Sequence, residues 1–207
     1  MKKYIFLVCA IFAFAIFSCQ QKERSVEILS STAIQLDSFP GTSPHLTKDN
    51  KGHIVLSWVR DMNDSSSIFC YAISKDGGKT FGTPITVPPS VNVHPHSENL
   101  PKVIFKPSGD IIAVWGVSNP TAANKYAGLI NYSQSFDDGR SWTEAKPLVR
   151  DTAGFDQRYS DIDLLPNGEI AIVWLDNRIT TAKDGAALYF ASTSGRNGFE
   201  QEKLISQ

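Results

Sequence analysis

The sequence has almost no net charge, few cysteines and only one long apolar run. Its 20 Lys and Arg residues balance 21 Asp and Glu residues, and there is no basic run, so nucleic-acid binding has no electrostatic support. The apolar run, Ile5–Phe17, is too short for a membrane-spanning helix. Of the three cysteines, only Cys70 lies beyond the N-terminal region, so it cannot form an intramolecular disulfide there and is expected to be buried. Short strand-like stretches with 14 glycines and 11 prolines are typical of a β-rich secreted domain.

The first residues indicate a targeting segment. Two lysines precede the apolar run, and the Ser18-Cys19 pair that follows it resembles the lipobox of bacterial lipoproteins. We therefore predict a signal peptide over residues 1–18 and a lipidated Cys19 with its tether over residues 19–29. The protein would be exported and anchored in a membrane by its lipid, in the periplasm or on the outer surface. The alternative is an ordinary secretory signal in which Cys19 has no role.

One motif occurs three times, about 60 residues apart, which indicates a repeated structural unit. Segments 74–81 and 135–142 read S-x-D-x-G-x-x-aromatic, and segment 192–199 is a weaker copy with Ser194 in place of the Asp. The Asp and Ser oxygens can accept hydrogen bonds from backbone N–H groups, the Gly allows a positive φ, and the aromatic ring can pack beneath the turn. The residues assigned to these structural turns are Ser74, Asp76, Gly78, Phe81, Ser135, Asp137, Gly139 and Trp142.

A second motif, G-(polar)-I-x-x-x-W, repeats in phase with the first, at segments 52–58, 109–115 and 168–174. Each unit reads as strand, Gly turn, strand, loop, strand, S-x-D turn and strand. Four antiparallel strands in about 60 residues form one blade of a β-propeller. The predicted blades span about 38–88, 89–150 and 151–207. One Trp at the same place in each blade is expected to pack between blades.

Three blades are fewer than the roughly 4–8 blades of closed propellers. In addition, Thr32–Leu36 reads as a further strand ahead of the first blade. We therefore expect a partial propeller that lacks C-terminal blades. The alternative is a head-to-tail homodimer of two three-blade halves.

The S-x-D-x-G-x-x-W turn resembles the Asp-box, or BNR repeat, of the sialidase-like six-bladed β-propellers. The resemblance covers residues 30–207, as the first half of such a propeller. It implies an all-β fold with three four-stranded blades of an expected six. It also implies that the Asp-boxes stabilise the fold, while chemistry lies on the opposite face, among the loops that enter the first strand and leave the second strand of each blade.

Histidines, arginines and carboxylates gather in those rim loops, which makes the rim the best candidate site. The candidate acid/base residues are Asp61 and Asp64, and the candidate substrate-binding residues are Arg60, His96, Glu98, Asp156, Arg158, Asp176 and Arg178. Alternatively, the Arg60–Asp61 and Asp176–Arg178 pairs are salt bridges that join blade ends. His94 and His96 have only Glu98 nearby as a third ligand, so we predict no metal, and no cofactor is expected.

Sialidases bind the sugar carboxylate with a cluster of arginines and use a Tyr, activated by a Glu, as nucleophile. Thr42 stands where the first of these arginines is expected, whereas Arg60 matches a second one. The resemblance implies a sialidase-family, exo-glycosidase-like lipoprotein that acts on or binds cell-surface or host glycans, and that is inactive as this chain alone. The alternative is a non-catalytic propeller that binds glycan or protein, and the sequence leaves enzyme activity open.

Overall fold

A computed structural model describes residues 33–63, 66–91, 93–122, 124–179 and 185–207. The chain divides into two units, residues 1–34 and 35–207. The signal peptide, Cys19, most of the tether and Asp64 lie outside the described residues. Nothing in the described part of the chain forms a helix with the length and apolarity that a membrane crossing requires.

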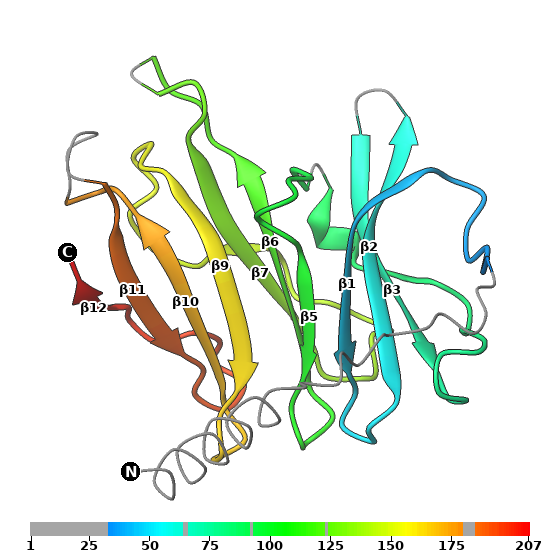
Figure 1. Cartoon of the computed structure of the whole chain (residues 1–207). Helices are drawn as coiled ribbons and strands as arrows, with labels where there is room; N and C mark the ends of the chain where they lie inside the picture. The colour runs from blue at the N-terminus through cyan, green and yellow to red at the C-terminus, as the bar shows by residue number, and fades with distance from the viewer. Residues whose placement is uncertain (1–32, 64–65, 92, 123, 180–184) are drawn as a thin grey trace, which may run out of the picture. The chain divides into compact units, whose positions relative to one another are not determined.

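The second unit consists of three four-stranded antiparallel sheets, which confirms the predicted all-β fold of three blades (Figure 1). In each blade the strands pair in chain order. The first blade contains β1 (Gly41–Lys48), β2 (Ile54–Asn63), β3 (Ser66–Ser74) and β4 (Ile85–Thr86). The second contains β5 (Lys102–Phe105), β6 (Ile111–Ser118), β7 (Gly128–Ser135) and β8 (Lys146–Pro147). The third contains β9 (Gln157–Leu164), β10 (Ile170–Asp176), β11 (Ala187–Ser192) and β12 (Lys203–Ser206), and one short 3-10 helix, Pro88–Ser90, precedes β5.

The extra strand that was expected over Thr32–Leu36 is not formed at residues 33–36, which are irregular. Apolar alternation alone cannot make a strand without a partner edge. Leu36 packs instead against a small cluster on the first blade that contains Trp58, Cys70 and Ala72. Cys70 is a buried free thiol, as predicted, and burial raises its pKa to about 11.

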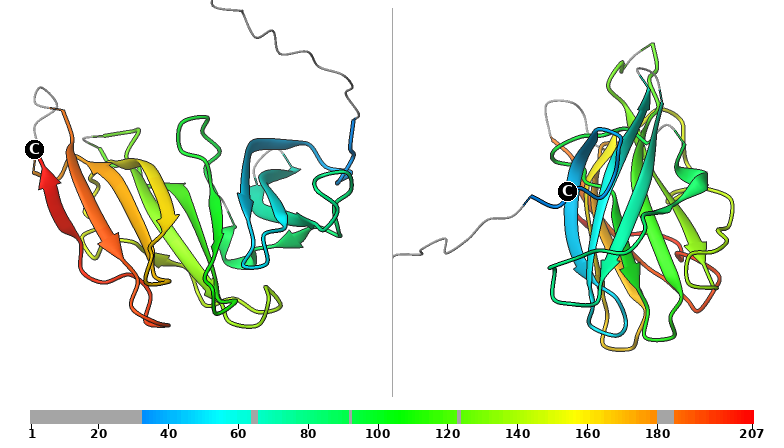
Figure 2. Two further views of the ribbon diagram at one scale, coloured as in Figure 1. Left: turned by 60° about the horizontal axis from the view of Figure 1, so that its bottom comes forward. Right: turned by 90° about the vertical axis from the view of Figure 1, so that its right-hand side faces the viewer.

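Apolar side chains hold neighbouring blades together. The blades stand side by side in chain order (Figure 2). Residues of the first and second blades form one buried cluster around Trp115, and residues of the second and third blades form another around Trp174. Both Trp side chains are fully buried, so the prediction that the Trp packs between blades is confirmed for these two. Trp58 lies instead in the small cluster of the first blade with Cys70 and Ala72.

The S-x-D turns connect the third and fourth strands of each blade. Asp76 Oδ1 accepts hydrogen bonds from the Ser74 hydroxyl at 2.8 Å and from the Thr80 N–H at 2.9 Å, and Asp76 Oδ2 accepts one from the Thr80 hydroxyl at 2.6 Å. Asp137 accepts the matching bonds from Ser141. These bonds favour the ionised carboxylates and lower the pKa of both Asp76 and Asp137 to about 2.

Candidate functional site

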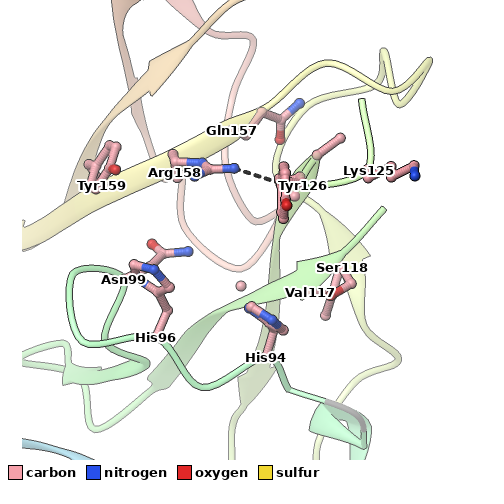
Figure 3. Close-up of a pocket in the computed structure, with 13 residues that line it drawn as sticks. His94, His96, Asn99, Val117, Ser118, Lys125, Tyr126, Gln157, Arg158 and Tyr159 are labelled. Carbon is pink, nitrogen blue, oxygen red and sulfur yellow. Dashed lines mark hydrogen bonds between the residues drawn. The ribbon is translucent and has the colours of Figure 1, made fainter. Parts of the chain in front are cut away.

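A cavity of about 170 Å³ lies between the second and third blades, at the rim predicted from the sequence (Figure 3). Three separate parts of the chain form it. They are the segment ahead of β5, the end of β6 with the loop that follows, and the first residues of β9. Figure 3 shows His94, His96 and Asn99 on one side of the opening and Arg158 and Tyr126 across from them.

Backbone bonds fix the histidine side of the cavity. The His94 N–H donates to the Gly116 carbonyl at 2.9 Å, and the Asn99 N–H donates to the His96 carbonyl at 3.1 Å. The two imidazole rings stack with centroids 6.5 Å apart and planes 19° from parallel. A Cβ at Gly116 would meet the Asn99 amide, so glycine at the end of β6 lets this amide approach the strand.

On the opposite side, Arg158 is held in one orientation. Its Nε lies 2.6 Å from the Asp156 carboxylate, and its Nη2 donates to the Tyr126 carbonyl at 2.6 Å. Partial burial acts to lower the pKa of this guanidinium, but the Asp156 charge and hydrogen bond outweigh it, and the pKa is raised. Asp156 also accepts the Gly128 N–H at 3.1 Å. The guanidinium therefore remains charged and links β9 to the loop ahead of β7.

Two tyrosines and a buried amide complete the cavity. The Tyr126 side chain is 83% exposed, whereas large aromatic side chains are more often mostly buried. Tyr159 has φ = 56° and lies at an irregularity in the β9–β10 register. Ser43, with φ = 53°, lies at a matching irregularity in the β1–β2 register, so this bulge recurs in the first strand of two blades, and in the third blade it redirects Tyr159. Gln157 is 1% exposed, and its Nε2 has no hydrogen-bond partner among the described residues.

The lining has a polar and cationic character. Arg158 and Lys125 contribute positive charge, and Lys125 points away from the histidines in Figure 3. Of the described residues that line the cavity, none is Asp or Glu. The cavity can therefore donate hydrogen bonds to a ligand, but by itself it lacks the pair of carboxylates that most glycoside hydrolases use.

The structure brings together some of the candidate substrate-binding residues. His96 and Arg158 line the cavity, and Asp156 supports Arg158. Glu98 is exposed and does not line the cavity, although its N–H donates to His96 Nδ1 at 3.2 Å. No group of three His, Cys, Asp or Glu side chains in the described ranges could hold a metal ion.

Arg60 and Asp61 lie at the end of β2, on the first blade. The Arg60 guanidinium is largely buried, forms an ion pair with Asp37 and lies 5.3 Å from the centre of the Phe39 ring. The Asp61 N–H donates to the Pro40 carbonyl at 3.0 Å. These contacts hold the segment that leads into β1.

Asp176 and Arg178 form a charged network at the end of β10. The Asp176 side chain is fully buried, 2.9 Å from Arg178 Nη2, and Arg178 Nη1 donates to Glu202 at 2.7 Å. The guanidinium also lies 4.4 Å from the centre of the Tyr189 ring. This network joins the end of β10 to the residue ahead of β12.

The sequence predicted the loops of the cavity but not its uncharged members. Asn99, Tyr126, Gln157 and Tyr159 all fall in or beside the rim loops, yet the candidate residues were chosen by charge. The available signal was the gathering of aromatic and amide side chains in those same loops.

No protein-family model matches the sequence, and no match is found among curated proteins. Similar solved structures include the GH93 alpha-L-arabinofuranosidase of Fusarium graminearum in complex with arabinobiose, with 14% identity over 80% of this chain and 50% of that chain and a TM-score of 0.58. The alpha-L-arabinanase of Penicillium chrysogenum, complexed with arabinobiose, has 17% identity over 79% of this chain and 50% of that chain and a TM-score of 0.54. A Hadza microbial sialidase has 14% identity over 77% of this chain and 36% of that chain and a TM-score of 0.51. The chain spans half or less of the length of these three proteins, and the likeness shows a β-propeller fold.

Proposed function

We propose that this chain binds carbohydrate and that the cavity between the second and third blades holds one sugar residue. The observation that carries the proposal is the convergence of Asn99, Arg158 and Tyr126 from three separate segments on one cavity. Two of the similar structures are glycan-acting propellers that hold arabinobiose, which supports a glycan as the ligand class.

The size of the cavity fits this ligand. A volume of about 170 Å³ is smaller than the roughly 300–1,000 Å³ of sites for larger small molecules. It suits a single sugar ring, with the rest of the glycan extending along the rim. The Asn99 amide and the Arg158 guanidinium would bind hydroxyl or carboxylate groups, while the exposed ring of Tyr126 would pack on the apolar face of the sugar.

Glycoside hydrolysis of the sialidase kind is the second candidate function. Its support is the position of Asp61 at the end of β2, on the same rim as the cavity, together with the structural likeness to a sialidase. Because the cavity lining contains no carboxylate among the described residues, the acid/base group would have to come from this neighbouring blade or from outside the chain.

We also propose that the protein is an exported lipoprotein with its lipid on Cys19. The support is the sequence alone, in which a basic start, a short apolar run and Ser18-Cys19 occur in the order that such signals require. A lipid anchor would keep the cavity at a membrane surface, where cell-surface or host glycans are met.

A glycan array followed by calorimetry tests the proposed binding. Wild-type protein should bind a defined group of glycans, and Tyr126→Ala should weaken that binding at least 10-fold without a change in melting temperature. The exposed Tyr126 ring makes few contacts, so its loss should not affect folding. A matched control is Val91→Ala, which removes another exposed apolar side chain that does not line the cavity. The proposal is wrong if no glycan binds, or if both variants bind like the wild type.

Fluorogenic glycosides separate the second candidate from the first. Turnover of a sialoside that is lost in Asp61→Asn would support the hydrolase. Binding of a glycan without turnover of any glycoside would support the binding function alone.

A further inference from the structure

The groups that line the cavity between the second and third blades suit a reaction that needs no carboxylate pair. They include imidazoles, phenols and a guanidinium, on His94, His96, Tyr126, Tyr159 and Arg158. The described lining contains no Asp or Glu. Abstraction of a proton from the carbon next to a carboxylate requires a base, an acid, and hydrogen-bond donors for the developing negative charge. The cavity contains all three kinds of group.

Arg158 and Gln157 form the donor side of the cavity. The Arg158 guanidinium has five N–H groups, and its contacts with Asp156 and the Tyr126 carbonyl fix its plane while further donors remain. The Gln157 Oε1 accepts the Ile130 N–H at 3.4 Å, and its Nε2 is buried without a partner among the described residues. A guanidinium matches the geometry of a carboxylate, and the Gln157 amide would supply a further donor to the same group.

His94 is the imidazole that is free to act as a base. The His96 Nδ1 accepts the Glu98 N–H at 3.2 Å, so the neutral His96 ring carries its proton on Nε2 and serves as a donor. The His94 ring forms no hydrogen bond with any described residue and stacks on His96. Both histidines are exposed. The His94 ring can therefore reach a ligand and take up a proton from it.

Tyr159 is the phenol beside the guanidinium. The Arg158 Cζ lies 6.0 Å from the centre of the Tyr159 ring, and Tyr159 is 43% exposed. In Figure 3 the side chains of Arg158 and Tyr159 follow one another along β9, across the opening from His94. A phenol hydroxyl can donate a proton to an oxygen atom of a ligand whose carboxylate is bound by Arg158. Tyr159 is therefore placed to act as an acid.

We propose that the cavity breaks glycosidic bonds by β-elimination in polysaccharides that contain uronic acid, with His94 as the base and Tyr159 as the acid. The proposal rests on the carbohydrate binding proposed above and names the substrate class of that site.

The step balances with the residues of the cavity alone. With the uronate carboxylate bound to Arg158, His94 removes the proton from C5 of the sugar. The C–H electron pair forms the C4=C5 double bond, the C4–O4 bond breaks, and O4 takes the proton of the Tyr159 hydroxyl. One product then ends in an unsaturated uronate and the other in a new reducing end, and no water is consumed. Proton transfer from His94 to Tyr159 through solvent restores both groups.

The charges of the cavity favour this substrate class. Removal of the C5 proton places additional negative charge on the carboxylate group, so the step needs positive charge and hydrogen-bond donors close to that group. Arg158 and Gln157 provide them, and Lys125 adds a second positive charge to the lining. No described lining residue is an Asp or Glu that would repel an acidic sugar. A neutral sugar could bind in the same cavity, but it has no carboxylate to make a neighbouring C–H group acidic.

Incubation of the full chain with polygalacturonate, alginate and hyaluronan tests the reaction. Two quantities are measured together: the ultraviolet absorbance of the double bond conjugated to the carboxylate, and the number of new reducing ends. β-Elimination predicts that both rise in equal amounts with at least one of the polymers. The same polymer with its carboxyl groups reduced to alcohols is the matched control and should give neither. Reducing ends without the absorbance would indicate hydrolysis and overturn the proposal, as would the absence of both with all three polymers.

Two variants test the assigned roles. His94→Ala keeps the backbone bond to Gly116 but removes the base, so kcat should fall roughly 100-fold or more, and added imidazole should restore part of it. Tyr159→Phe removes the acid and should lower kcat by a similar factor with little change in KM. His53→Ala removes an imidazole that does not line the cavity, and this control should keep wild-type activity. A His94→Ala variant that remains fully active would overturn the role of His94.

Calorimetry with the unreduced polymers separates this proposal from the carbohydrate binding on which it rests. Binding that Tyr126→Ala weakens, without any unsaturated product, would overturn the elimination and leave the carbohydrate binding intact. Absence of binding to these polymers, together with absence of binding on the glycan array, would contradict both.

Discussion

A methyl group added at Gly139 should destabilise the protein more than one added at Gly52, because Gly139 lies at the junction between the first and second blades and Gly52 has open space around it. Gly139 has φ = 81°, and a Cβ there would overlap the Tyr71 hydroxyl and lie 3.4 Å from Tyr71 Cζ. Gly52 has the same φ of 81° but no atom within 4 Å of its Cβ position. The pair Gly139→Ala and Gly52→Ala therefore separates the packing cost from the backbone cost.

The magnitudes follow from these two causes. A left-handed conformation costs a residue other than glycine about 1–2 kcal/mol, which both variants share. Displacement of the buried Tyr71 ring adds an overpacking cost of about 1–3 kcal/mol in Gly139→Ala alone. For a domain of this size, 1 kcal/mol corresponds to roughly 2–4 °C, so Gly139→Ala should melt about 2–12 °C below Gly52→Ala.

A double variant makes the test specific for the Tyr71 hydroxyl. This hydroxyl is buried without a hydrogen-bond partner among the described residues, so Tyr71→Phe alone should be neutral or stabilising. In Tyr71→Phe/Gly139→Ala the overlapping oxygen is gone, and the melting temperature should return to within a few degrees of Gly52→Ala. Circular dichroism or differential scanning calorimetry measures all four proteins. Equal melting temperatures for the two glycine variants, or no recovery in the double variant, would refute the reasoning.

Three further outcomes are expected. Hydrogen bonds hold the pKa of Asp137 at about 2, below its unfolded value, so the stability that this group contributes is present above about pH 4 and lost as the pH falls through 2. Asp137→Asn should therefore melt at a lower temperature than the wild type at pH 7, and the difference between the two melting temperatures should be smaller at pH 2. Asp176→Ala removes one of the two carboxylates that pair with the largely buried Arg178 guanidinium, and only Glu202 is left as an ion-pair partner among the described residues. The free energy of unfolding in urea should fall by about 3–5 kcal/mol, and a loss under 1 kcal/mol would argue against a structural role. Cys19→Ser should abolish lipid attachment, and a mass spectrum of the wild type without a lipid adduct would contradict the anchor.

The turns and strands could be predicted because each depends on residues that are close in the sequence. Asp76 and Thr80 interact within one turn, and in each blade a Gly stands two residues ahead of the second strand, which contains the Trp. Repetition at a constant spacing then fixed the blade as the unit. These interactions lie within single blades, so they can be predicted without knowing how the blades are arranged.

The cavity and the binding partners of several charged side chains could not be predicted in the same way. Arg158 binds the Tyr126 carbonyl 32 residues away, and Arg60 binds Asp37, 23 residues earlier and just after the stretch that was expected to be a strand. Such pairings depend on the loop conformations ahead of β1 and β7. Charge alone therefore predicts a site at the rim, but it could not show which of the rim residues bind one another and which face the cavity.

The most direct test of carbohydrate binding is a titration of ¹⁵N-labelled protein with arabinobiose and, separately, with a sialyl oligosaccharide, followed by amide chemical shifts. The account predicts that at least one of the two shifts the amides of Asn99, Gly116, Gly128 and Arg158, which surround the cavity. Tyr126→Ala should reduce those shifts at equal ligand concentration. Shifts confined to other blades, or no shifts with either ligand at millimolar concentration, would contradict it.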